Sequence, residues 1–151
     1  MKKIKHLSIL LSLFLFVNCS KTENTVTLIP EGYKGTVKIW FNQANGFKEK
    51  YEGEKRIYEI PENGILKTKF NPQFAYHFSE YYYENKTGER VEIKPILDLN
   101  KKVLDTIRRD KVYAYGFMSL GEVVKIDSLG NVTEKKEPGI IFSVANPAEW
   151  K

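Results

Sequence analysis

Cys19 is the only cysteine in the chain, so its thiol is the only one available for modification or for bonding to another sulfur. It ends an N-terminal segment in which three early lysines precede a nearly unbroken apolar run over residues 7–17. A positive start, an apolar stretch of about 7–15 residues and a cleavage site make a secretory signal, which is too short to span a membrane. With no second cysteine, Cys19 cannot form an intramolecular disulfide.

The residues around Cys19 resemble the box at which bacterial lipoprotein precursors are acylated and cleaved. In that box an aliphatic or aromatic residue lies three positions before the cysteine, and here the stretch reads Leu15-Phe16-Val17-Asn18-Cys19. We predict that residues 1–18 are a signal peptide and that residues 19–24 are a lipidated cysteine with a polar tether. Two or three acyl chains hold a protein stably on a membrane, since each buried methylene contributes about 0.8 kcal/mol. The alternative is an ordinary signal with an incidental cysteine.

Loss of the signal changes what the charge of the chain implies. The formal net charge is +5 for the whole chain but about +2 without Lys2, Lys3 and Lys5. The remaining sequence has no basic cluster interleaved with aromatic residues, so it does not indicate a nucleic-acid partner. It is long enough for one domain and too short for two, and we place that domain at residues 25–151.

Few residues beyond the predicted signal peptide are candidates for catalysis. His77 is the one remaining histidine, and strand alternation places it opposite the neighbouring phenylalanines, which is typical of a solvated residue rather than a base. No Gly-x-Ser-x-Gly elbow is present. Carboxylate pairs such as Glu59 or Glu31 with Glu62 would need about 5–10 Å spacing in a cleft to hydrolyse a glycosidic bond, and the sequence does not distinguish them from solvated acids. We therefore expect a protein that is not an enzyme.

Metal and cofactor sites are equally poorly supported. Zinc needs several His or Cys ligands, which one histidine and an acylated cysteine cannot supply. Calcium needs a dense acidic loop, and the loop at residues 127–131 contains a single acid, Asp127. The sequence predicts no metal and no cofactor.

An aromatic cluster is the most promising binding feature, because six of the ten residues from 74 to 83 are Phe or Tyr. Strand alternation puts Phe74, Tyr76 and Phe78 on one face, which makes them the candidates for the core. Tyr81 and Tyr83 fall on the opposite face, with Tyr82 between them, unless a bulge near residues 79–80 resets the register. The predicted binding surface consists of Tyr81, Tyr82, Tyr83 and, from an earlier strand, Trp40. Such rings suit protein interfaces and the faces of sugars. The alternative is cross-strand packing, in which aromatic pairs stabilise a hairpin by about 0.2–1 kcal/mol each.

Period-two apolar patterns dominate the elements that must position these residues. In residues 36–41, Val37, Ile39 and Phe41 share one side while Trp40 lies on the other. Similar runs, most of them bounded by turns rich in Pro, Gly and Asn, cover residues 56–60, 65–70, 75–83, 90–93, 112–117, 122–127 and 139–144. About eight to ten short strands separated by such turns predict an all-β fold, a single small β-sandwich.

One segment departs from the strand pattern. The apolar residues at positions 96, 99, 103 and 107 have helical spacing, Pro95 precedes them, and Asp98 or Asn100 can cap the start. We predict one short helix near residues 98–110, packed on the sheets, with an irregular crossover loop as the alternative.

Two turn sequences give the chain a wider resemblance. Residues 29–35 read Ile-Pro-Glu-Gly-Tyr-Lys-Gly, an IPEGY-x-G motif before the first long strand, and residues 60–64 read Ile-Pro-Glu-Asn-Gly. With the tyrosine-rich hairpin at residues 81–93 and the strand at 139–144, these stretches resemble an uncharacterised family of small bacterial lipoproteins, a domain of unknown function that opens with the same motif. The resemblance implies an envelope lipoprotein with one compact domain, and it identifies no catalytic residue. At least one glycine of the motif is expected to have a positive φ.

These observations predict a membrane-anchored lipoprotein of the bacterial envelope, extracytoplasmic, on the periplasmic face or the cell surface. We expect it to act as a non-enzymatic binding or accessory module whose partner is a protein or a glycan. An inhibitor or immunity-type lipoprotein, which blocks an attacking enzyme, is the first alternative. A hydrolase with an unrecognised site is the second.

Overall fold

The computed structural model describes residues 22–150, so the predicted signal peptide and Cys19 lie outside the described residues. Within residues 22–150 the chain forms twelve strands, one short α-helix and one 3-10 turn. In chain order these are β1 (Thr25–Pro30), β2 (Gly35–Trp40), β3 (Tyr51–Glu52), β4 (Lys55–Glu59), β5 (Ile65–Lys67), β6 (Ser79–Glu84), β7 (Arg90–Glu92), β8 (Lys94–Ile96), α1 (Lys101–Leu104), β9 (Tyr113–Leu120), β10 (Val123–Ile126), β11 (Val132–Lys136), β12 (Gly139–Ala145) and η1 (Pro147–Glu149).

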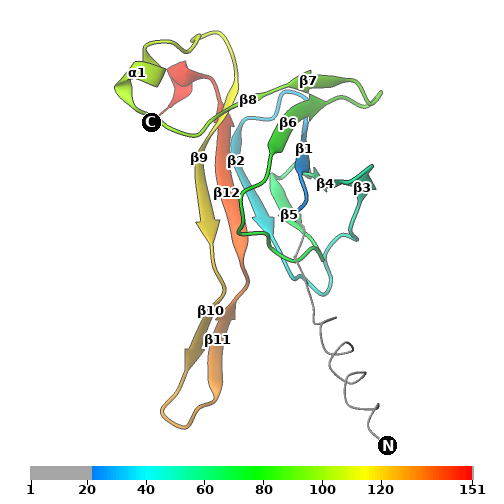
Figure 1. The fold of residues 1–151 in the computed structure, drawn as a ribbon, viewed down its shortest axis with the longest axis vertical. Helices are drawn as coiled ribbons and strands as arrows, with labels where there is room; N and C mark the ends of the chain where they lie inside the picture. Colours follow the sequence, from blue (N-terminus) through cyan, green and yellow to red (C-terminus); the bar gives the residue numbers. More distant parts are fainter. Residues whose placement is uncertain (1–21, 151) are drawn as a thin grey trace, which may run out of the picture.

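Two five-stranded sheets form the body of the protein (Figure 1). One sheet has the order β3-β4-β1-β6-β7 and the other has the order β5-β2-β12-β9-β8. The predicted all-β sandwich is thus confirmed. The number of strands exceeds the predicted eight to ten, because β1, β3, β8 and β11 lie outside the runs that showed a period of two. The strands β3 and β8 are too short to show it, and β1 is buried on both faces.

The main core lies between the two sheets, where alternate residues of each strand face inward. On β2 these are Val37 and Ile39, as the sequence pattern predicted. The buried core cluster consists of Ile29, Val37, Ile39, Phe41, Tyr58, Ile60, Leu66, Phe70, Tyr81, Ile93, Ala114, Phe142 and Val144. The central strand β1 is also covered on its outer face, where a smaller cluster contains Val26, Leu28 and Ile57.

The two turns that carry the resemblance meet in space. Gly32 and Gly64 have φ values of +76° and +75°, and Gly35 has a φ of +138°, so the expected positive φ is confirmed. The Tyr33 hydroxyl donates a 2.7 Å hydrogen bond to the Thr36 carbonyl and lies directly against Gly64. Glycine is required at position 64, because a Cβ there would lie 1.9 Å from the Tyr33 hydroxyl oxygen.

The predicted helix is present but short. Asn100 caps it, and its side-chain oxygen accepts a 3.0 Å hydrogen bond from the Val103 backbone N–H. The prediction that this helix packs on the sheets is wrong, since none of its residues is buried and Leu104 is exposed. Of the helical apolar stripe only Ile96 is buried, and it belongs to β8, where it pairs with β9.

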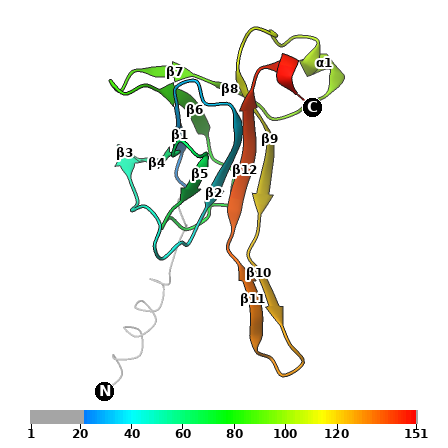
Figure 2. The same cartoon turned by 180° about the vertical axis from the view of Figure 1, so that it is seen from behind.

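One end of the sandwich holds both the start of the described chain and the base of a long hairpin (Figures 1 and 2). Glu23, just before β1, is hydrogen-bonded to Gln73 in the loop after β5. The Phe41 N–H, just after β2, donates a 2.9 Å hydrogen bond to the carbonyl of Pro138, which links the β10–β11 hairpin to β12. We call this end the tether end; α1 lies at the opposite end (Figure 1).

Candidate binding surface

Tyr81 belongs to the core, which contradicts the prediction that it forms an exposed face. Its side chain is 9 % exposed. The ring contacts Phe117 and Phe142 at centroid distances of 5.4 and 5.3 Å. Burial raises the pKa of the Tyr81 hydroxyl to about 12, because the phenolate would lose its hydration. For Tyr81, the alternative interpretation, in which the ring packs inside the protein rather than binding a partner, is therefore correct.

The other predicted surface residues are partly buried and do not come together. Tyr83 packs against the main core, and its hydroxyl donates a 2.6 Å hydrogen bond to the Tyr33 carbonyl. Tyr82 packs on the opposite face of its sheet, against the small outer cluster. Trp40 lies on the outer side of the other sheet, as alternation predicted, and its ring lies over Gly139, where a Cβ would be 2.6 Å from the ring.

Within the aromatic cluster at residues 74–83, the exposed rings are instead the three that alternation assigned to the core. Phe74, Tyr76 and Phe78 are 69 %, 84 % and 66 % exposed. They lie in residues 71–78, which connect β5 to β6 at the tether end and which we call the aromatic loop. The Tyr76 and Phe78 rings make an edge-to-face contact with a centroid distance of 5.7 Å. Together they form an exposed aromatic surface.

The predicted strand over residues 75–83 starts late for a physical reason. The strand β6 runs parallel to β1, and Ser79 pairs with Thr25, the first residue of β1. Residues 74–78 lie before the start of β1 and have no strand to pair with. The alternation rule therefore does not apply to them, and their side chains point to solvent rather than alternating between two faces.

Hydrogen bonds to the chain start hold the aromatic loop in place. The Gln73 side chain accepts a 2.7 Å hydrogen bond from the Glu23 N–H and donates a 3.0 Å bond to the Glu23 carbonyl. At the other end, the Phe78 N–H donates to the Asn24 side chain at 3.2 Å, and the Phe78 carbonyl accepts from the Thr25 N–H at 2.9 Å. The loop is thus fixed at both ends while its rings stay exposed.

Arg56 on β4 ties the same parts together. Its guanidinium forms an ion pair with Glu23 at 2.5 Å and donates a 2.6 Å hydrogen bond to the Asn71 carbonyl. It also lies 4.8 Å from the centre of the Phe70 ring. Arg56 is largely buried, and its contacts join the aromatic loop to Glu23 and to the Phe70 ring in one ordered unit. Such order lowers the entropy that binding would cost.

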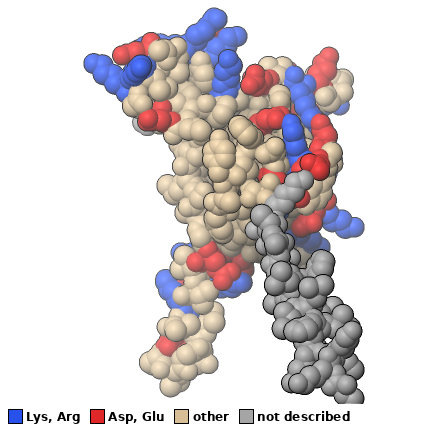
Figure 3. Space-filling model, in the orientation of Figure 1, with Lys and Arg blue, Asp and Glu red and all other residues tan. Residues whose placement is uncertain are grey.

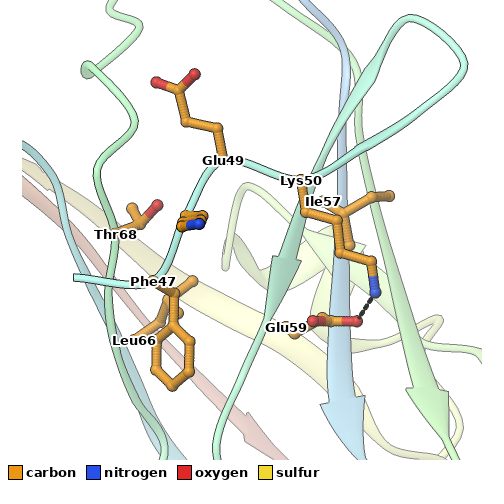
Figure 4. Close-up of a pocket in the computed structure, with 8 residues that line it drawn as sticks. Phe47, Glu49, Lys50, Ile57, Glu59, Leu66 and Thr68 are labelled. Carbon is orange, nitrogen blue, oxygen red and sulfur yellow. Dashed lines mark hydrogen bonds and ion pairs between the residues drawn. The ribbon is translucent and has the colours of Figure 1, made fainter.

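A groove beside β4 and β5 does not bring an acid–base pair together. It has a volume of about 440 Å³ and lies between the segment at residues 47–50 and strands β4 and β5. In Figure 4, Glu59 faces Lys50, with which it forms an ion pair, and Glu49 points away from Glu59. Glu62 lines a separate groove of about 280 Å³.

His77 and the possible metal ligands give no further site in the part of the chain that the structure describes. His77 lies in the aromatic loop rather than on a strand, and its Nδ1 is 2.9 Å from the Ala75 carbonyl oxygen. Residues 22–150 contain no group of three or more His, Cys, Asp or Glu residues that could hold a metal ion. No helix within these residues is long and apolar enough to cross a membrane.

The fold and this surface define a small all-β sandwich protein with an ordered, exposed aromatic loop at the end where its chain begins. The chain belongs to a family of unknown function (DUF6843), which matches residues 21–137. A crystal structure of a candidate lipoprotein from Bacillus anthracis has a similar fold, with a TM-score of 0.55 and 19 % sequence identity over 87 % of this chain and 76 % of that one. No curated protein matches the sequence. The expectation of an uncharacterised family is thereby confirmed.

Proposed function

We propose that the protein is a membrane-anchored lipoprotein of the bacterial envelope that binds a protein or glycan partner through its aromatic loop, without catalysing a reaction. The lipid at Cys19 would hold the domain on the membrane. The loop would hold the partner. The signal-like N-terminus and the resemblance of the fold to a candidate lipoprotein support the first part of the proposal.

The exposure of Phe74, Tyr76 and Phe78 on a fixed backbone supports the second part. Aromatic side chains bury about 150–250 Å² each when a partner covers them. At about 25 cal/mol per Å², covering the exposed two-thirds of one ring is worth about 3 kcal/mol, so three rings supply enough for specific binding after the cost of association. Because the loop is already ordered by Arg56 and the chain start, little of this gain is spent on ordering it.

Site-specific photocrosslinking in intact cells tests the binding role. A photoreactive phenylalanine at Tyr76 should give a discrete crosslinked product, and the same group at Val91, which is exposed on β7 at the other end of β6, should not. The product should disappear in a Phe74→Ser, Phe78→Ser background. Equal products at both positions, or none at Tyr76, would contradict the proposal. The mass and composition of the crosslinked product would show whether the partner is a glycan, a protein, or an enzyme that the loop blocks.

Metabolic labelling with a fatty-acid analogue tests the anchor. Cys19→Ala should lose the label and accumulate as precursor or in the soluble fraction, whereas Ser20→Ala, next to it, should be labelled like the unsubstituted chain. Equal labelling of the two variants would remove the basis for the anchor.

A further inference from the structure

The β10–β11 hairpin extends beyond the body of the protein (Figures 1 and 2). Its two strands pair with each other and form a separate two-stranded sheet. An isolated two-stranded hairpin is marginally stable in water, because it has no second layer on which to bury its apolar side chains. The hairpin is nevertheless rich in such side chains, which calls for an explanation.

Beyond its base, where Val123 lies on the charged face, the apolar residues of the hairpin are gathered on one face and at its apex. Ile126 and Val132 form a cross-strand pair and are both exposed, and Val124 lies on the same face by alternation. Leu129 in the connecting turn is 85 % exposed. The Asp127 carboxylate accepts hydrogen bonds from the Leu129 and Asn131 N–H groups, both at 2.9 Å, so the turn that carries Leu129 is ordered.

The opposite face of the hairpin is charged and largely self-neutralised. Glu134 forms ion pairs with Lys125 and Lys136 on that face. At the base, Lys135 forms ion pairs with Glu122 and Glu137. The outer part of the hairpin is therefore amphipathic, with charges on one face and apolar residues on the other face and at the apex, whereas its base is mixed. Such a distribution suits the boundary between water and lipid.

The position at which the described chain begins indicates which membrane the apex of the hairpin can reach. The hairpin base and the start of the described chain share the tether end, and Cys19 lies five positions before Asn24. Five extended steps of the chain span at most about 17 Å. The five steps from Glu122 to Asp127, which include β10, also span about 17 Å as a strand, and the turn that carries Leu129 lies beyond them. A membrane that holds the acyl chains of Cys19 therefore lies within reach of the hairpin apex.

We propose that the apex of the β10–β11 hairpin is a second membrane contact, in which Ile126, Leu129 and Val132 enter the interface of the bilayer that holds Cys19. This inference rests on the proposed lipid anchor. The hairpin reaches at least as far as the fully extended tether, so its apex can enter the interface, where such elements lie about 5–10 Å deep. Two contacts fix the orientation of the domain, whereas a lipidated tether alone leaves it free to rotate.

The remaining surface agrees with this orientation. In Figure 3 the Lys and Arg side chains gather around α1, at the end opposite the hairpin, while the outer part of the hairpin is nearly free of them. The α1 end would face away from the membrane. The aromatic loop would face the space between the body and the bilayer, so its partner would be met at the membrane surface.

Fluorescence of the mature, acylated chain in vesicles of phosphatidylethanolamine and phosphatidylglycerol tests the proposal. Acylation blocks the thiol of Cys19, so one introduced cysteine can carry an environment-sensitive dye. The dye at Leu129→Cys should shift to shorter wavelength on reconstitution and be quenched by nitroxide-labelled lipids. The matched position is Thr87→Cys, in the exposed turn after β6 at the opposite end, where neither change should occur. Within the hairpin, Val132→Cys should be quenched more strongly than Lys125→Cys on the charged face.

Three other outcomes of this experiment would overturn the proposal, each for a different reason. Equal responses at Leu129 and Thr87, or no quenching at either, would exclude a membrane contact by the hairpin. A shift that depends on protein concentration in detergent would assign the apex to a second copy of the chain instead. Reaction of the thiol-reactive dye with the unsubstituted chain would show that Cys19 has a free thiol and is not acylated. That result would overturn the lipid anchor together with this inference.

Discussion

Gly64 offers a direct test of why the two turn motifs contain glycine. Gly32 and Gly64 have φ values of +76° and +75°, so alanine would suffer the same backbone strain at both positions. They differ in their surroundings. A Cβ on Gly32 has no neighbour within 4 Å, whereas a Cβ on Gly64 would lie 1.9 Å from the Tyr33 hydroxyl oxygen and 2.8 Å from the Thr36 carbonyl oxygen.

The magnitudes follow from this comparison. A left-handed φ costs an L-residue about 1–2 kcal/mol, and the reduced freedom of the unfolded chain offsets about 0.4–1 kcal/mol of that. Gly32→Ala should therefore lower the free energy of unfolding by about 1 kcal/mol. Gly64→Ala adds an overpacked contact of about 1–3 kcal/mol and the loss of the Tyr33–Thr36 hydrogen bond, about 0.5–1.5 kcal/mol. Rotation of the Tyr33 ring cannot relieve the strain fully, because the Thr36 oxygen belongs to the backbone.

Thermal and urea unfolding of residues 20–151 measures the difference. For a domain of this size 1 kcal/mol corresponds to about 3–5 °C, so Gly64→Ala should melt about 10 °C below Gly32→Ala. A Tyr33→Leu substitution in the Gly64→Ala background should recover part of the loss, since it removes the nearest atom. Equal melting temperatures for the two alanine variants would refute the contact between the motifs as the reason for glycine at position 64.

Three further predictions concern the core and the stability of the domain. Tyr81→Ser should cost about 3–5 kcal/mol, whereas the double variant Phe74→Ser, Phe78→Ser should melt within a few degrees of the unsubstituted domain; the reverse order in a thermal melt would contradict the observed burial. Because burial raises the pKa of Tyr81 from 10.0 to about 12, the native state keeps a proton that the unfolded chain loses. The free energy of unfolding should not depend on this hydroxyl below about pH 10, and it should fall by about 2–3 kcal/mol as the pH rises toward 12. In urea unfolding at a series of pH values, Tyr81→Phe should show a smaller fall above pH 10. An equal fall in the two proteins would contradict the assignment of this pH dependence to Tyr81. Chelators should leave the melting temperature unchanged, since residues 22–150 contain no cluster of metal ligands; a downward shift would reveal a metal.

Most of the longer strands were predictable because they show their own alternation of buried and exposed residues. On β2 the pattern of Val37 and Ile39 identified the inward face without knowledge of any neighbour. The strand β1 was not predicted, because it lies between two parallel neighbours and is buried on both faces, so its residues do not alternate. The strands β3 and β8 were missed because two or three residues cannot repeat a period of two. They form because a longer strand beside them offers free backbone hydrogen-bonding groups.

The aromatic cluster shows where local patterns fail. Alternation assigned Phe74, Tyr76 and Phe78 to the core and Tyr81 to the surface, and the structure reverses both assignments. Tyr81 faces inward because β6 pairs with β1 from Ser79 onward, and this register sets which alternate residues meet the other sheet. The start of β1 at Thr25 ends the pairing and leaves the three earlier rings in solvent.

The sequence by itself determined the features that depend on neighbouring residues along the chain: the signal-like segment that ends at Cys19, the β class of the domain, a helix capped at Asp98 or Asn100, and a positive φ in at least one motif glycine. Tertiary structure alone decided the features that depend on distant partners. It brought Tyr33 against Gly64, Glu23 against the aromatic loop, and the hairpin base to the end where the described chain begins. The physical reason is that burial and strand register are set by which segments lie side by side, and a local periodicity contains no information about that choice.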